Sequence, residues 1–79
     1  MTIADILTIY DRWNDQIIRV YNVKDYGREN EAKTIYPMCY GWELPSKMVL
    51  GDYQNMMRTE VLSFKSNLGV ALHFYVEEV

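Results

Sequence analysis

The chain has 79 residues, of which 49% are hydrophobic, 14% aromatic and 24% charged, and its formal net charge is −3. A chain of this length builds one small core that buries roughly 60% of the surface exposed by its unfolded form, so we expect a single domain over residues 1–79. The composition excludes disordered, collagen-like and disulfide-scaffold proteins. The acidic balance disfavours nucleic-acid binding, which needs an excess of Lys and Arg to neutralise phosphates.

Residues 2–14 have the spacing of an amphipathic helix. Four apolar side chains recur at i, i+3, i+4 and i+7 and so share one stripe: Ile6, Ile9, Tyr10 and Trp13. Thr2 precedes the first turn and Asp5 lies in it, where a hydroxyl and a carboxylate satisfy or complement the free backbone N–H groups. Asn14 and Asp15 are typical turn residues, and the helix is predicted to end there.

Residues 16–23 change to β-branched and aromatic side chains, which is the composition of a strand. Both alternating sets are apolar, so this strand is predicted to be covered on one face, partly screened on the other, and central in its sheet. Residues 24–33 are rich in charged side chains and show no apolar period. They predict an exposed loop.

The middle of the chain combines apolar residues with breakers. Residues 34–42 are strongly apolar, but Pro37 and Gly41 interrupt a regular ladder, so a short edge strand with a bend is predicted there. Residues 43–50 predict one or two helical turns. Pro45 is tolerated at the start of such a helix, and Gly51 is placed to end it.

The last third of the chain predicts an antiparallel hairpin. Residues 59–66 and 70–76 alternate between apolar and polar side chains, and Asn67 and Gly69 between them both tolerate positive φ. The C-terminal strand is a candidate sheet edge. The predicted fold is α+β, in which the N-terminal helix packs on a small, three- to four-stranded antiparallel sheet with a C-terminal hairpin.

Four stretches define the order of these elements. They are the capped N-terminal helix that starts Met1-Thr2-Ile3-Ala4-Asp5-Ile6-Leu7, the strand Asp15-Gln16-Ile17-Ile18-Arg19-Val20-Tyr21, the turn Trp42-Glu43-Leu44-Pro45, and the terminal hairpin. This order resembles that of small accessory proteins encoded by bacteriophages and prophages, over most of the chain. Members with assigned roles tend to bind a host protein, including host defence complexes, and to inhibit or redirect it. The resemblance implies a role of that kind and assigns no functional residue.

The motifs of common cofactor and metal sites are missing from the sequence. Nucleotide loops need closely spaced glycines, whereas the four glycines here are scattered singly, and zinc needs three or four ligands, whereas Cys39 and His73 are the only soft ones. We therefore expect no cofactor and no metal. Cys39 and His73 could form a nucleophile and a base. We expect instead that Cys39 is a buried thiol and that His73, on the outward set of its strand with Tyr75, is a surface or interface side chain, so no catalytic residue is assigned.

Compartment and membrane contact follow from what the sequence lacks. A single cysteine forms no internal disulfide, which fits a reducing compartment. The sequence has no signal-peptide pattern, no lipidation motif and no run approaching 18 apolar residues. We expect a protein of the bacterial host cytoplasm that makes no membrane contact.

Aromatic residues are numerous for so small a core, with seven tyrosines and two tryptophans. Two clusters combine Tyr, Trp and Met, which interfaces favour, and supply the interface candidates: Tyr36, Met38, Tyr40, Trp42, Tyr53, Met56 and Met57. The alternative is that these side chains complete the core. Tyr21, His73 and Tyr75 would form a stacking platform for nucleic acid if they shared a face, but the sequence offers no basic groove beside them.

The sequence thus favours a non-enzymatic protein from a phage or another mobile element that binds a host protein and blocks or redirects it, for example a defence-system inhibitor such as an anti-CRISPR. The alternative is a structural or assembly protein that forms homo-oligomers, a homodimer among them. An assembly protein would show a melting temperature that depends on its own concentration, without an added partner.

Overall fold

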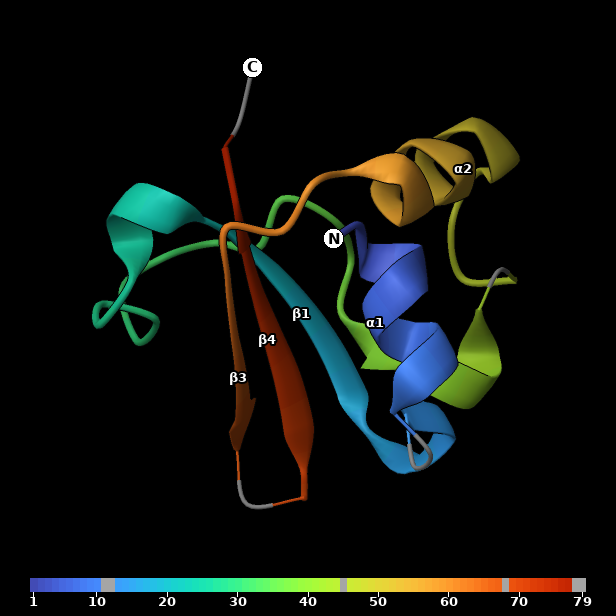
Figure 1. Ribbon diagram of the computed structural model, residues 1–79, viewed down its shortest axis with the longest axis horizontal. Coiled ribbons are helices and arrows are strands. Elements are labelled where there is room, and N and C mark those ends of the chain that lie inside the picture. Colours follow the sequence, from blue (N-terminus) through green and yellow to red (C-terminus); the bar gives the residue numbers. More distant parts are fainter. Residues whose placement is uncertain (11–12, 45, 68, 78–79) are drawn as a thin grey trace.

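The computed structural model describes residues 1–10, 13–44, 46–67 and 69–77. Within them, two helices and four strands follow one another (Figure 1): α1 (Ile3–Ile9), β1 (Ile17–Asn22), β2 (Cys39–Tyr40), α2 (Leu50–Arg58), β3 (Ser63–Asn67) and β4 (Ala71–Val76). Three short 3-10 turns lie between them: η1 (Trp13–Asp15), η2 (Val23–Asp25) and η3 (Gly41–Glu43).

The strands form one sheet in the order β2-β1-β4-β3. The central pair β1 and β4 is parallel, from Ile17 opposite Ala71 to Asn22 opposite Val76, while β2 and β3 join the two edges antiparallel. The α+β class, the terminal hairpin and the central place of β1 are confirmed, but the sheet is mixed rather than purely antiparallel. The predicted edge position of the last strand is wrong, because β4 is central and all six of its residues are buried.

Helix α1 begins as predicted and ends earlier than predicted. The Thr2 hydroxyl accepts a hydrogen bond from the Asp5 backbone N–H at 3.2 Å, and the Asp5 carboxylate accepts one from the Thr2 N–H at 3.0 Å, which is a complete capping box. These bonds lower the pKa of Asp5. The helix ends at Ile9 because Tyr10 takes an extended conformation. Residues 11–12 of the predicted helix lie outside the described residues.

Helix α2 corrects the prediction for the middle of the chain. The predicted helical turns at residues 43–50 are replaced by η3 and irregular turns, and Gly51, expected to end a helix, lies in the first turn of α2. Pro45 lies outside the described residues. The helix forms over the following residues because Asp52 lies in its first turn and Arg58 in its last, where each charge complements the helix dipole.

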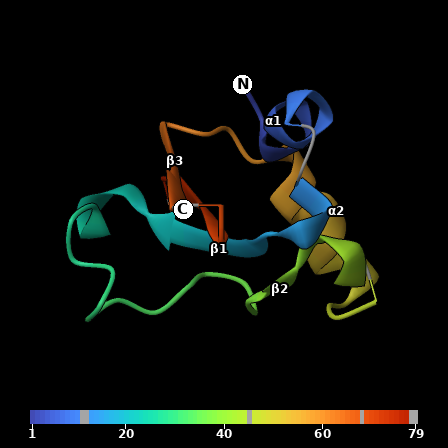
Figure 2. The same cartoon turned by 90° about the horizontal axis from the view of Figure 1, so that it is seen from below.

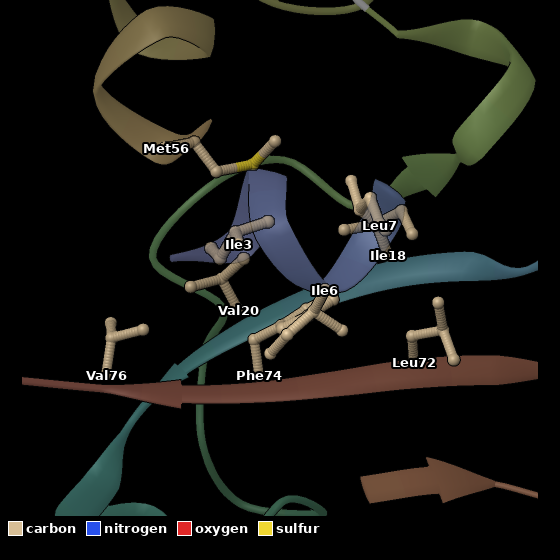
Figure 3. Packing of buried hydrophobic residues seen from close by; sticks show 9 residues of the cluster. All are labelled: Ile3, Ile6, Leu7, Ile18, Val20, Met56, Leu72, Phe74 and Val76. Atoms are coloured by element: carbon tan, nitrogen blue, oxygen red, sulfur yellow. The ribbon is translucent and has the colours of Figure 1, made fainter. Parts of the chain in front are cut away.

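The hydrophobic core lies between the sheet and the two helices. Figure 3 shows α1 and α2 on the same side of β1 and β4, with buried side chains of all four elements meeting between them. Nine residues form this cluster: Ile3, Ile6, Leu7, Ile18, Val20, Met56, Leu72, Phe74 and Val76. The edge strand β3 extends the same face, since the Phe64 ring lies 5.3 Å from the Phe74 ring.

The opposite face of β1 and β4 is covered by residues 23–38, which we call the covering loop. Figure 2 shows this segment, in green after η2, on the other side of β1 from α1. The loop is joined to the edge of β1 by a hydrogen bond from the Ile35 N–H to the Val20 carbonyl, at 2.7 Å. Many of its charged side chains are exposed as predicted, but it also covers part of the sheet.

Both edge strands are short. The edge strand predicted within residues 34–42 is confirmed at Cys39–Tyr40. The first hairpin strand runs over Ser63–Asn67 rather than residues 59–66. In the turn between β3 and β4, the Val70 N–H donates to the Asn67 carbonyl at 2.9 Å, and Gly69 has a φ of 72°, which a side chain would strain. Leu68 lies outside the described residues.

Candidate functional site

The structure separates the seven interface candidates into an exposed and a packed group. Three are exposed by 54%, 43% and 66%, in the order Met38, Tyr40 and Trp42. Four belong to the core or pack against it: Tyr36, Tyr53, Met56 and Met57. The exposed three are close in sequence, at β2 and η3, and we call them the 38–42 patch.

The rings of Tyr40 and Trp42 are stacked at the surface. Their centroids lie 6.0 Å apart and their planes differ by 15°. Together the two exposed rings offer a large apolar area with two polar tips, the phenol O–H and the indole N–H. The patch borders a small pocket of about 190 Å³, which is lined by side chains that include Met38, Tyr40 and Glu43.

The backbone that carries these rings is fixed on both sides. The Gly41 N–H donates to the Gln16 carbonyl at 2.9 Å, and a Cβ at Gly41 would fall on the Trp13 backbone and 2.6 Å from its ring carbon Cε3. The Tyr40 N–H donates to the Glu43 carboxylate at 2.9 Å. This N–H is therefore not free to pair with a strand of another protein.

The packed group belongs to the fold. Tyr53, Met56 and Met57 lie at i, i+3 and i+4 on α2, so one helix face turns all three toward the core. Met56 is only 1% exposed, which corrects its assignment as an interface candidate. Tyr36 is part-buried and packs against the same core cluster.

Beneath the covering loop lies a second cluster, built from aromatic and charged side chains. The Tyr21 ring is stacked 5.8 Å from that of Tyr75 and lies 5.6 Å from the His73 ring, and the Tyr26 ring lies 4.7 Å from Tyr75. Tyr75 donates its hydroxyl hydrogen to the Glu29 carboxylate. We call these five residues the Tyr75 network, and Lys65 joins it by an ion pair with Glu29 at 3.5 Å.

The proton positions in the Tyr75 network follow from its hydrogen bonds. Tyr75 has one hydroxyl hydrogen and gives it to Glu29, so its oxygen accepts from Nδ1–H of His73 at 3.2 Å. A neutral imidazole with the hydrogen on Nδ1 leaves Nε2 as an acceptor. That atom is buried and has no hydrogen-bond partner.

The same contacts shift three pKa values. The hydrogen bond from Tyr75 is the main reason that the pKa of Glu29 falls from 4.5 to about 2, and Lys65 lowers it further. Burial raises the pKa of Tyr75, and the Glu29 carboxylate adds to the rise. Burial also lowers the pKa of His73, helped by the positive charges of Arg19 and Lys65.

The Tyr75 network was not predicted from the sequence. The prediction that His73 lies at the surface is also wrong. His73 is 5% exposed rather than a surface residue, because the covering loop screens its face of the sheet. Tyr21, His73 and Tyr75 do share a face, but all three are buried, so they offer no open stacking platform. The signal in the sequence was the set Ala71, His73 and Tyr75 on β4, which lacks the charged residues of a solvated face.

Cys39 and His73 do not form a nucleophile and base in this structure. Cys39 lies opposite Ile18 and His73 lies opposite Arg19, and successive residues of β1 point to opposite faces of the sheet. Cys39 is buried as predicted. Burial raises the pKa of its thiol, and the Glu43 carboxylate raises it further.

Within residues 1–10, 13–44, 46–67 and 69–77, no group of three or more His, Cys, Asp or Glu side chains is arranged to hold a metal ion. Neither helix there has the length and apolar character needed to cross a membrane. Compared with protein-family models, curated proteins and solved structures, the chain gives no match.

Proposed function

We propose that the chain is a binding protein that attaches to another protein through the 38–42 patch and blocks or redirects it, with no catalytic step of its own. The observation that carries the proposal is the stacked, exposed pair Tyr40 and Trp42. Tyr and Trp bury a large area at a low cost in conformational entropy, and they are enriched among the residues that dominate binding energy.

The surroundings of the patch support recognition by side chains. The hydrogen bonds at Gly41 and Tyr40 hold the backbone between the rings, so little ordering remains to be done on binding. Met38 is flexible and polarizable, which lets it adapt to a partner surface. The loose likeness to phage accessory proteins supports a host protein of the bacterial cytoplasm as the partner, and a defence complex is one such class.

A photo-crosslinking experiment tests this proposal. Benzoylphenylalanine is placed at position 42, or at position 62 as a control, since Leu62 is 56% exposed and lies outside the patch. Both proteins are irradiated in a bacterial lysate and the adducts are identified by mass spectrometry. We expect a distinct adduct from position 42 only, and equal adducts from both positions would contradict the proposal.

Variants of the 38–42 patch then test how much it contributes to the binding free energy. Tyr40→Ala and Trp42→Ala should each weaken binding to the captured protein by about tenfold or more, as expected for central aromatic residues of an interface. Leu62→Ala should leave the affinity unchanged. Unchanged affinity in both patch variants would show that the partner binds elsewhere.

The outer edge of β3 favours a homodimer as the second candidate. β3 is an edge strand of five residues, four of them exposed, so its outer backbone groups are open to a strand of another copy. Sedimentation velocity over a range of concentrations measures this association. A dimer through β3 persists in Trp42→Ala, whereas a dimer through the patch is lost.

A further inference from the structure

The covering loop leaves a pocket between itself and the sheet. Its volume is about 590 Å³, which is within the range of sites for small molecules. The lining combines basic, polar and aromatic side chains, among them Arg19, Tyr21, Asn30, Lys33, Thr34 and Met38. This pocket is separate in role from the 38–42 patch, although Met38 lies at the border of both.

The charges in this pocket are not balanced from within. Glu29 also lines it, but its carboxylate already binds the Tyr75 hydroxyl and the Lys65 ammonium group. Arg19 and Lys33 form no ion pair with any residue in the described part of the chain. Two cationic groups therefore face the same space in a protein whose net charge is −3.

Arg19 is held in the sheet with part of its hydrogen-bonding capacity unused. Its Nε–H donor is buried and has no partner, whereas the unpartnered Nε2 of His73, its neighbour across β1 and β4, is an acceptor and adds nothing to an anion site. Unsatisfied buried polar atoms are rare in folded proteins, since each one costs free energy. The buried Nε is out of reach of a ligand in the pocket, so an anion would contact the terminal N–H groups of the guanidinium, which match the geometry of a phosphate or a carboxylate.

We propose that this pocket binds a small organic anion, in which a phosphate monoester or carboxylate contacts Arg19 and Lys33 and an apolar body lies against Met38 and Ala32. The proposal goes beyond the protein-binding function, because it concerns a different class of ligand, although Met38 belongs to the 38–42 patch and Arg19 also lines the small pocket beside that patch.

Titrations followed by ¹H–¹⁵N NMR test the proposal with four probes. Phenyl phosphate and benzoate carry a ring and an anion, benzyl alcohol carries only the ring, and inorganic phosphate carries only the anion. We expect the first two to shift the amide signals of residues 29–34 and to saturate in the range of about 1 mM. Benzyl alcohol should give no saturating shift, and inorganic phosphate should bind more weakly than phenyl phosphate.

Three variants locate the anion. Arg19→Gln should weaken phenyl phosphate binding by about tenfold or more, because a bond to a charged group is lost. Lys33→Glu should weaken it by at least about fivefold, since it reverses a charge near the anion. Lys24→Glu is the matched control, because it reverses the charge of an exposed lysine of the covering loop that does not line the pocket. It should leave the affinity within about a factor of two.

The results of these titrations either support the anion site or overturn it. Stronger binding of phenyl phosphate or of benzoate tells whether the site prefers a phosphate monoester or a carboxylate, and either result supports it. Absence of saturation with both, or equal shifts with benzyl alcohol, overturns the proposal. Equal losses in Lys33→Glu and Lys24→Glu overturn it as well, because they indicate only a general effect of net charge. If Arg19→Gln fails to fold, Lys33→Glu decides alone, since Lys33 is exposed.

Discussion

The two faces of the central strands are both buried, but by different means. On the helix side, β1 and β4 present aliphatic side chains and Phe74 to α1 and α2, and shape is the main requirement. On the loop side they present rings with polar tips, and each tip needs a partner. Glu29 supplies that partner for Tyr75. A charged loop can therefore cover a sheet face when that face carries Tyr and His.

The helix side should show the largest effect of a single change. Phe74 is fully buried in the core, so Phe74→Ala should lower the free energy of unfolding by about 3–5 kcal/mol. That is comparable with the whole stability of a domain of this size. We expect a broad or absent unfolding transition by circular dichroism. A cooperative transition close to that of the wild type would show that the helix side is not the main source of stability.

The loop side should show a smaller and more local effect. Tyr75→Phe keeps the buried ring and removes the hydroxyl, so Glu29 and Nδ1 of His73 lose a partner. We expect a loss of about 1–3 kcal/mol in urea unfolding, together with faster hydrogen exchange in the covering loop and little change in α1. Tyr26→Phe is the matched control, since Tyr26 is largely exposed. Equal loss of protection in α1 would contradict a separate role for the loop side.

Acid should act on the two faces unequally, because the shifted groups of the Tyr75 network lie on the loop side. The pKa of Glu29 is 4.5 when unfolded and about 2 when folded, so the unfolded chain takes up this proton first. The stability from Glu29 is complete above about pH 4.5 and is lost as the pH falls toward about 2. The pKa of His73 is lowered below 6.5, so its contribution is lost in the same direction, starting at a higher pH.

Unfolding measured over a series of pH values separates these two contributions. Glu29→Gln should flatten the decline below about pH 4.5, and His73→Gln should flatten the decline that begins near pH 6.5. Asp5 also has a lowered pKa, so some decline in acid should remain in both variants. A decline in Glu29→Gln as steep as in the wild type would show that the bond with Tyr75 does not shift this carboxyl.

The sequence predicted the elements whose own residues determine them. The capping box at Thr2 and Asp5 and the β-branched run of β1 are local, and both were found. The parallel pairing of β1 and β4 joins residues more than fifty positions apart, and alternation alone does not reveal it. Gly51 misled the prediction because a glycine near an apolar run fits a helix end as well as its first turn.

The candidate site was also predicted only in part, because local composition identifies its residues whereas long-range packing decides which of them are exposed. The aromatic clusters identified the 38–42 patch, but composition could not separate Trp42 from Met56, since both are large apolar residues and only packing decides which is covered. The Tyr75 network was not predicted, because the hydrogen bond between Tyr75 and Glu29 joins residues 46 positions apart. In addition, Glu29 lies in a loop whose composition is that of a solvated segment.

The patch should show the smallest effect on folding, since it lies on neither buried face. Trp42 is 66% exposed, so Trp42→Ala should change the free energy of unfolding by no more than about 0.5 kcal/mol. Tyr40→Ala should cost slightly more, because Tyr40 is less exposed and lies in β2. Parallel urea titrations measure both. A Trp42→Ala loss approaching that of Phe74→Ala would make Trp42 a core residue, whereas a near-neutral result is what the proposed role of this ring in partner binding requires.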